Sequence, residues 1–255
     1  MAPVKVFITG ASSGIGAALA REYARRGAQL GLFARRADAL AALAADLGTA
    51  SAVYPGDVRD RPALAAAAAD FIARYGAPDA VIANAGISRG TLSDHAEDNA
   101  TFEAIMDTNV LGVLYTFQPF LPAMRNARAG TLVGIASIAG FRGLPGAGAY
   151  SASKAAVIRY LESLRVELRG SGVAVVTVCP GYVATPMTER NPYRMPFLLP
   201  ADKAARLIVR AIACRKRFYV LPWPMGWLGR LFSAVPRPLY DRVFARAKRK
   251  PRVGG

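Results

Sequence analysis

Histidine and cysteine are scarce in this chain, which has one histidine and two cysteines in 255 residues. Cys179 and Cys214 are too few and too far apart to form a disulfide framework. No group of Cys and His residues has the spacing of a zinc site, and we therefore expect no metal. His95 lies in a polar stretch, where we expect it to be solvated.

Long hydrophobic runs are also missing. No stretch of about 20 uninterrupted apolar residues occurs, so the sequence predicts no transmembrane helix. Residues 1–6 include no apolar run of signal-peptide length, and we expect a cytoplasmic protein. Hydrophobic residues nevertheless make up 53% of the chain and charged residues 20%, which suits a large buried core. The length favours one α/β domain.

Acidic residues are few, with 17 against 33 basic ones and a net charge of +16. The imbalance is local, because residues 203–252 contain 14 Lys or Arg and a single acid, Asp241. The remainder is nearly neutral, so the total charge is weak evidence for nucleic-acid binding. We therefore predict a nearly neutral body over residues 1–221 and a basic, Trp-containing extension over residues 222–255.

Short apolar runs alternate with Ala-rich helical stretches, which is typical of a parallel sheet covered by helices. Glycines at several helix ends support the boundaries. The predicted strands are 4–8, 29–34, 50–54, 79–83, 130–136, 173–179 and 218–221. The predicted helices are 14–26, 37–47, 61–75, 149–168 and 201–214, with one or two more over 99–124.

A glycine-rich turn lies between the first predicted strand and the first predicted helix. Its glycines permit a tight turn and a close approach of the backbone, so that a pyrophosphate can bind at the helix N-terminus. A structural glycine-rich turn without a ligand is the alternative. The predicted dinucleotide-binding residues here are Gly10, Ser12, Ser13, Gly14, Ile15 and Gly16.

The end of the second predicted strand bears on the type of dinucleotide. An acid near this point favours the ribose 2′-hydroxyl of NAD, and a cation favours the 2′-phosphate of NADP. Here Arg35 and Arg36 follow the strand, with no acid before Asp38. Arg35 is the better placed, and Ser12 or Ser13 could assist it. NADP(H) is therefore favoured over NAD(H), unless both arginines merely solvate the start of a helix.

Tyr150 and Lys154 are four residues apart, and therefore share one face of the predicted helix 149–168. A nearby ammonium favours the phenolate, so we expect Lys154 to lower the pKa of Tyr150 from its usual value of about 10. Such a tyrosine can give a proton to a carbonyl oxygen. The pair alone could indicate any activated tyrosine.

Further motifs accompany this pair in a fixed order. They are Thr9 to Gly16 (T-G-x-x-x-G-x-G), Asp57-Val58, Asn84-Ala85-Gly86, Asn109, Ser137, Tyr150-x-x-x-Lys154, Pro180-Gly181, and Val183 with Thr185. Together they resemble the short-chain dehydrogenase/reductase family, in its NADP-preferring subgroup, over about residues 4–221. Ala83 departs from the family motif N-N-A-G, whose first Asn is missing here.

The resemblance implies a single-domain Rossmann fold with a doubly wound, seven-stranded parallel sheet in the order 3-2-1-4-5-6-7. It implies that Tyr150 is the acid/base, that Lys154 holds the nicotinamide ribose, and that Ser137 binds the carbonyl oxygen. Asn109 would hold a water of a proton relay. The other motif residues, Asp57, Val58, Asn84, Ala85, Gly86, Pro180, Gly181, Val183 and Thr185, would contact the cofactor. Relatives commonly form homodimers or homotetramers.

The resemblance therefore implies an oxidoreductase that interconverts a ketone and a secondary alcohol. A substrate lid is expected over about residues 185–200, and its apolar residues favour a hydrophobic substrate. Reduction of a 3-oxoacyl thioester is the main alternative. A non-catalytic dinucleotide-binding regulatory protein is an alternative of another class.

Beyond Leu221, the tail combines Trp223 and Trp227 with many basic residues. Three interpretations stay open. The tail could form a lid or dimer contact, or it could lie on an anionic membrane surface. Nucleic-acid binding is disfavoured, because no base-stacking platform or nucleic-acid motif accompanies the basic cluster.

Overall fold

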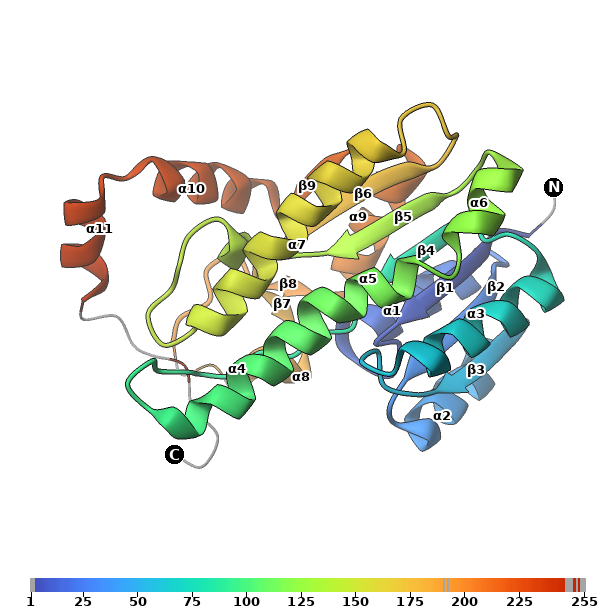
Figure 1. Ribbon diagram of the computed structural model, residues 1–255, viewed down its shortest axis with the longest axis horizontal. Helices are drawn as coiled ribbons and strands as arrows, with labels where there is room; N and C mark the ends of the chain where they lie inside the picture. Colours follow the sequence, from blue (N-terminus) through green and yellow to red (C-terminus); the bar gives the residue numbers. More distant parts are fainter. Residues whose placement is uncertain (1–2, 190, 192, 246–249, 251, 253–255) are drawn as a thin grey trace.

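The computed structural model describes residues 3–189, 191, 193–245, 250 and 252. Its centre is a parallel seven-stranded sheet in the order β3-β2-β1-β4-β5-β6-β9, with helices on both faces (Figure 1). This is the predicted Rossmann fold and the predicted strand order. The strands are β1 (Lys5–Thr9), β2 (Gln29–Ala34), β3 (Ser51–Pro55), β4 (Ala80–Ala83), β5 (Thr131–Ile135), β6 (Ala174–Pro180) and β9 (Phe218–Leu221).

Helices follow most strands, as the parallel sheet requires. Those of the body are α1 (Gly14–Ala24), α2 (Ala37–Leu47), α3 (Arg61–Tyr75), α4 (Asn99–Met106), α5 (Gly112–Phe117), α6 (Leu121–Ala127), α7 (Gly148–Glu167), α8 (Pro186–Glu189) and α9 (Ala201–Ala213). Two more, α10 (Trp223–Ala234) and α11 (Arg237–Phe244), follow β9. Short strands β7 (Val183–Ala184) and β8 (Leu199–Pro200) pair outside the main sheet.

Each face of the sheet has its own hydrophobic core. On one face, α1, α2 and α9 pack against the strands through side chains such as Leu19, Leu40 and Ile208, all fully buried. On the other, α3, α5 and α7 pack through side chains such as Phe71 and Leu161. Because both faces are covered, the strands are almost uninterrupted apolar runs.

The strand order reverses between β1 and β4, which lie side by side at the centre of the sheet. Connections leave these neighbouring strands in opposite directions, so a crevice opens beyond their carboxyl ends. The glycine-rich turn follows β1 and the Asn84–Gly86 turn follows β4. The fold therefore places two of the predicted motifs at one crevice.

The segment 99–124 differs from the one or two helices predicted for it. It forms α4, a π-helical turn over Asp107–Leu111, α5 and the first part of α6. π-Helical turns are rare and often occur at functional sites. The turn here contains the predicted site residue Asn109.

The tail packs on the body through α10 and α11. A Cβ built on Gly229 of α10 would lie 2.5 Å from the Phe141 ring, so this glycine lets the helix approach closely. Arg142 donates hydrogen bonds to the carbonyl oxygens of Phe232 (2.8 Å) and Val235 (2.8 Å) at the end of α10. Its guanidinium also lies 4.1 Å from the centroid of the Tyr240 ring on α11. Among the described residues, no helix has the length and apolar character needed to cross a bilayer.

Candidate active site

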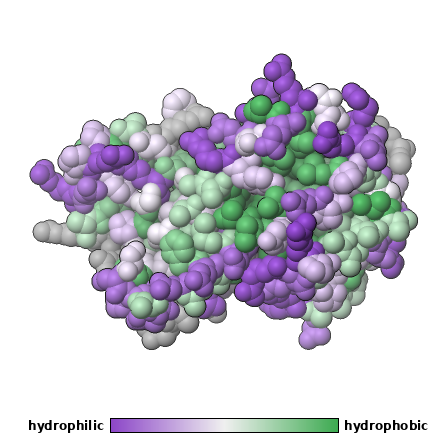
Figure 2. Space-filling model, in the orientation of Figure 1, coloured by the Kyte–Doolittle hydropathy of each residue, from purple (hydrophilic) through white to green (hydrophobic). Residues whose placement is uncertain are grey.

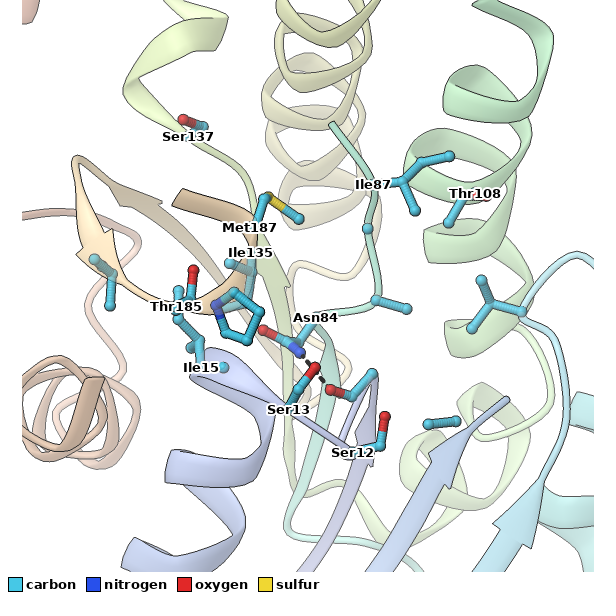
Figure 3. A pocket seen from close by; sticks show the side chains of 18 of the residues that line it. Ser12, Ser13, Ile15, Asn84, Ile87, Thr108, Ile135, Ser137, Thr185 and Met187 are labelled. Atoms are coloured by element: carbon cyan, nitrogen blue, oxygen red, sulfur yellow. Dashed lines mark hydrogen bonds between the residues drawn. The ribbon is translucent and has the colours of Figure 1, made fainter. Parts of the chain in front are cut away.

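A cleft of about 390 Å³ lies beyond the carboxyl ends of the central strands. Figure 3 shows Ile87 and Thr185 on opposite sides of it, with Ser12 and Ser137 toward its two ends. The predicted site residues that line it are Gly10, Ser12, Ser13, Gly14, Ile15, Arg35, Arg36, Asp57, Val58, Asn84, Ala85, Gly86, Ser137, Tyr150, Lys154, Pro180, Gly181, Val183 and Thr185. Gly16 and Asn109, which were also predicted, are not among the residues that line it.

The glycine turn leaves no room for side chains. Gly10 has a φ of +67°, and a Cβ there would lie 2.8 Å from the Cα of Ala85. A Cβ on Gly16 would lie 2.2 Å from the carbonyl oxygen of Gly10. Ser13 is the N-cap of α1, yet its side chain caps no backbone N–H. The first turn of α1 therefore presents its N–H groups to the cleft, which fits the pyrophosphate of a dinucleotide.

The turn after β4 is fastened to the glycine turn. The Asn84 side-chain amide donates to the carbonyl oxygens of Thr9 (3.0 Å) and Gly10 (3.3 Å). The Thr9 hydroxyl oxygen accepts from the backbone N–H groups of Asn84 (3.2 Å) and Ala85 (3.3 Å). Ala83, which replaces the first Asn of the family motif, is buried in β4. The remaining asparagine thus makes the link between the two turns.

Two arginines follow β2 at the end of the cleft near Ser12. Arg36 donates to the backbone oxygen (3.0 Å) and the hydroxyl oxygen (3.3 Å) of Ser12. Arg59 hydrogen-bonds the carboxylate of Asp57 and lowers its pKa, and the charge of Arg35 lowers it further. Arg36, and not the favoured Arg35, therefore makes the direct contact with the glycine turn. Both guanidinium groups border the same end of the cleft.

Ser137 lies at the opposite end, where β5 runs into the 3₁₀ turn Ile138–Gly140. Its hydroxyl oxygen accepts from the backbone N–H of Ala139 (3.1 Å), and the hydroxyl lies 3.4 Å from the carbonyl oxygen of Pro180. It also forms a hydrogen bond with the phenol of Tyr150. Tyr150 stands in the first turn of α7. A serine and a tyrosine hydroxyl therefore meet in the cleft.

The pKa of Tyr150 differs from the sequence-based expectation. Removal of the phenol from water raises its pKa above 10, and the hydrogen bond from Ser137 offsets part of this rise. The Lys154 ammonium lies 5.8 Å from the centroid of the tyrosine ring. It does not overcome the desolvation, so the expected lowering of the Tyr150 pKa is wrong for this structure. The phenol holds its proton at neutral pH.

Lys154 lies one helical turn beyond Tyr150 and is buried. Its ammonium donates to the carbonyl oxygen of Ile135 (2.9 Å), and burial lowers its pKa to about 8. A Cβ on Gly86 would lie 3.2 Å from the Asn109 side-chain oxygen and 3.5 Å from the Lys154 nitrogen, so this glycine packs closely beside the ammonium. The cation is therefore held at the point where β4, β5 and α7 converge.

Asn109 fastens the wall of the cleft. Its side-chain oxygen accepts from the backbone N–H of Ile87 (2.8 Å). Its amide nitrogen donates to the Ile87 carbonyl oxygen (3.0 Å) and to the Ser153 hydroxyl (3.0 Å). Asn109 is fully buried, and these contacts join the π-helical turn to α7 and to the loop after β4. The proton relay expected of it stays a prediction.

Several residues of the cleft were not predicted. They are Ala34, Gly56, Ile87, Thr108, Ile135 and Ala136, whereas Pro186, Met187 and Thr188 belong to the predicted lid. Most of them adjoin a predicted motif or a strand end, and this adjacency was the available signal. A second cation is also near the site, since the Lys250 nitrogen lies 5.6 Å from the centroid of the Tyr150 ring. No motif in the sequence marks this lysine.

Comparison with known proteins agrees with this geometry. The family model described as short chain dehydrogenase matches residues 4–194. The chain is 38% identical to an uncharacterized oxidoreductase of Myxococcus xanthus, covering 94% of this chain and 96% of the relative. It is 36% identical to 11-beta-hydroxysteroid dehydrogenase 1A of Arabidopsis thaliana, covering 84% of this chain and 67% of the relative.

A solved structure of a dehydrogenase is also similar to this chain. The structure of an alcohol dehydrogenase from Thermococcus sibiricus, complexed with 5-hydroxy-NADP, aligns with a TM-score of 0.77 and 28% identity. The alignment covers 86% of this chain and 95% of the other. The chain therefore belongs to the short-chain dehydrogenase/reductase family and is an oxidoreductase of this family, whose members bind a nicotinamide dinucleotide.

Proposed function

We propose that the protein interconverts a ketone and a secondary alcohol with NADP(H), with Tyr150 as the acid/base. One observation is central to this proposal. The Ser137 hydroxyl, the Tyr150 phenol and the Lys154 ammonium converge at one end of a cleft whose other end fits a pyrophosphate. A protein that only sensed a dinucleotide would not need all three groups.

The bound nicotinamide supplies or accepts the hydride, and the protein handles the proton. In the reductive direction, Tyr150 donates its proton to the carbonyl oxygen while Ser137 holds that oxygen by a hydrogen bond. The raised pKa of Tyr150 keeps the phenol protonated, as a proton donor must be. Lys154, charged below about pH 8, stabilises the phenolate that remains. Its ammonium also adjoins Gly86, which lines the cleft where the ribose would lie.

Further residues are assigned to the cofactor by their place along the cleft. Arg35, Arg36 and the Ser12 hydroxyl form a cationic group suited to a 2′-phosphate. The adenine would lie at Asp57 and Val58. The nicotinamide end is assigned to Asn84, Ala85, Gly86, Pro180, Gly181, Val183 and Thr185. We also assign to Asn109 the water of a proton relay. In this proposal residues 1–221 form the catalytic unit and residues 222–255 form an extension.

A hydrophobic substrate fits the segment over residues 185–200. Met187 lines the cleft, and Phe197 and Leu198 are exposed although both are large and apolar. An apolar side chain that lines a cleft, as Met187 does, favours an apolar ligand. The relative named as a hydroxysteroid dehydrogenase supports a free lipophilic ketone more than a thioester.

A substrate panel tests this proposal. Purified protein would be given aliphatic ketones, steroid ketones and 3-oxoacyl thioesters with NADPH or NADH, and the loss of absorbance of the reduced cofactor would be followed. We expect turnover of a lipophilic ketone with NADPH. A preference for a thioester would show that the substrate is not a free ketone. A preference for NADH would refute the role of Arg35 and Arg36 in binding the 2′-phosphate. No turnover of any carbonyl compound would contradict the reaction type.

The tail supports a proposal of peripheral membrane contact. Trp223, Trp227 and Leu231 recur every four residues on α10 and are each about 70% exposed. Leu239 and Val243 are exposed on α11. An apolar stripe within a strongly basic segment suits an anionic lipid surface. Replacing both tryptophans by Ser should abolish co-sedimentation with phosphatidylserine liposomes, and unchanged binding would refute the contact.

A homodimer or homotetramer is also proposed. Figure 2 shows apolar side chains gathered across the middle of the face that α4, α5 and α7 occupy in Figure 1. Phe102, Leu111 and Val166 are exposed on these helices and on the π-helical turn between them. Light scattering would give the mass in solution, and replacing Val166 by Glu should shift it to that of a monomer.

A further inference from the structure

Two basic residues near the C-terminus lie beside the active site. α11 lies at one end of the molecule in Figure 1, whereas Lys250 and Arg252 contact residues between β4 and α4. Lys250 contacts the loop after β4, and Arg252 contacts the start of α4. Neither contact follows from the catalytic motifs.

Arg252 anchors this segment by two ion pairs. Its guanidinium donates to the carboxylate of Asp98 (2.8 Å) and to that of Glu97 (2.9 Å). Asp98 is buried and also accepts from the backbone N–H of Leu92 (2.8 Å), so it is a fixed partner. The pairing with Arg252 holds the pKa of Asp98 below its usual range. Arg252 is therefore held at a defined place, just before α4.

Lys250 is next to the reacting tyrosine. Its ammonium donates to the Ser88 hydroxyl (2.7 Å) and lies 5.6 Å from the centroid of the Tyr150 ring. Ser88 comes two residues after the Asn84–Gly86 turn that borders the cleft. The lysine thus places a positive charge beside the tyrosine, next to the loop after β4.

This charge has no acidic partner within the part of the chain that the structure describes. The ion pairs there include Arg252 with Glu97 and Asp98, but none joins Lys250 to a carboxylate. Lys250 is half-buried, and desolvation lowers its pKa. A partly desolvated cation is stabilised by an anion. Because the cofactor phosphates are assigned to the far end of the cleft, a substrate carboxylate is a candidate partner for this lysine.

We propose that Lys250 is a specificity-determining residue that selects substrates with a carboxylate near the reacting carbonyl. Arg252 is a positioning residue that holds Lys250 in place. The substrate class becomes an oxo or hydroxy acid whose apolar chain contacts Met187. This inference rests on the proposed function, because it takes Tyr150 as the reacting group. The basic tail would also attract such an anion to the cleft.

A binding experiment tests Lys250 without depending on turnover. Octanoate and methyl octanoate would be titrated by calorimetry into the protein saturated with NADP⁺. We expect octanoate to bind the wild-type protein at least about tenfold more tightly than it binds Lys250→Met, because a charge-assisted hydrogen bond is lost. Lys250→Arg should keep most of the preference for octanoate over the ester. Lys216→Met, a change of an exposed lysine near Tyr219, is the matched control.

Either of two results would overturn the proposal. One is a wild-type protein that binds the ester as tightly as the acid, and the other is a preference for the acid that survives in Lys250→Met. Deletion of residues 250–255 supplies a third check. If the deletion tightens the binding of both ligands, the segment obstructs the cleft, and the selective role of Lys250 is refuted.

A turnover experiment separates this inference from the proposed function. Oxidation of 3-hydroxyoctanoate and of its methyl ester with NADP⁺ would be compared as kcat/KM. The ratio of acid to ester should fall about tenfold or more in Lys250→Met, mainly through KM, and should fall less in Arg252→Gln. An unchanged ratio overturns the role of Lys250 and leaves the reaction intact. If the protein oxidises neither compound but binds octanoate as expected, the proposed function is contradicted and the anion site at Lys250 is still supported.

Discussion

Removal of the two arginines after β2 should reverse the preference for NADPH. Arg35→Ala and Arg36→Ala, combined in one protein, delete both guanidinium groups at the Ser12 end of the cleft. The backbone there should persist, because the glycine turn is fastened independently by Asn84 and Thr9. The change therefore removes charge and hydrogen bonds while keeping the cleft.

The expected loss of NADPH affinity can be estimated from the exposed position of the two arginine side chains. A hydrogen bond to a charged group contributes about 1.5–3 kcal/mol. Both arginines are exposed, so solvent and salt place each at the lower end of this range. Two such bonds amount to about 3 kcal/mol, which is roughly a 100-fold change in Kd. Binding of NADH, which has no 2′-phosphate, should change less than about threefold.

Fluorescence titration of NADPH and NADH would measure both constants at low salt. The matched control is Arg21→Ala with Arg25→Ala, which removes two exposed charges from the end of α1 that is away from the glycine turn. The control should bind both cofactors as the wild-type protein does. An unchanged ratio of NADPH to NADH affinity in the Arg35/Arg36 variant would refute the assignment of the phosphate site.

Three further outcomes follow from the structure. Gly16→Ala forces a Cβ against the Gly10 carbonyl oxygen, so urea unfolding should show a loss of about 1–3 kcal/mol, and NADPH binding should weaken; an unchanged midpoint would contradict this. The pKa of Lys154 is about 8, so its ammonium is charged below that pH and neutral above it. The kcat/KM for reduction should therefore fall as the pH rises through 8. A profile that is flat from pH 7 to 9 would refute the role of Lys154 in stabilising the phenolate. Arg142→Ala removes the hydrogen bonds at the end of α10, so hydrogen exchange over residues 223–244 should become faster, while unchanged exchange would show that the tail is held elsewhere.

Local signals explain which elements could be predicted. The bounds of β2, α2, α3 and β9 agree with the predicted ranges to the residue. α2 ends at Gly48, which has a φ of +59°, and α3 ends at Gly76, which has a φ of +80°. A left-handed or otherwise strained conformation at a helix end favours glycine, so these stops are visible in the sequence.

Long-range contacts explain what could not be predicted. The π-helical turn is held by Asn109, whose partners Ile87 and Ser153 are 22 and 44 residues away. The end of α10 is held by Arg142, about 90 residues earlier. No local pattern indicates either contact. The raised pKa of Tyr150 is similar in origin, because desolvation depends on the packing of the whole cleft and not on the spacing of Tyr150 and Lys154.

Most residues that line the cleft could be predicted from local sequence motifs. These motifs are short and lie at strand ends, where a parallel sheet brings distant segments together. Lys250 is the exception, since it reaches Tyr150 from a tail without a recognisable motif. Sequence alone therefore predicted that Tyr150 belongs to the cleft and missed the cation beside it.

The most direct measurement compares cofactor binding and turnover in Tyr150→Phe. The change removes the phenolic hydroxyl and keeps the ring, with Tyr160→Phe on the same helix as control. We expect kcat for carbonyl reduction to fall about 10²–10⁴-fold, the usual contribution of a general acid, while the Kd of NADPH changes less than about threefold. Turnover within tenfold of the wild-type rate would contradict the assignment of Tyr150 as the proton donor.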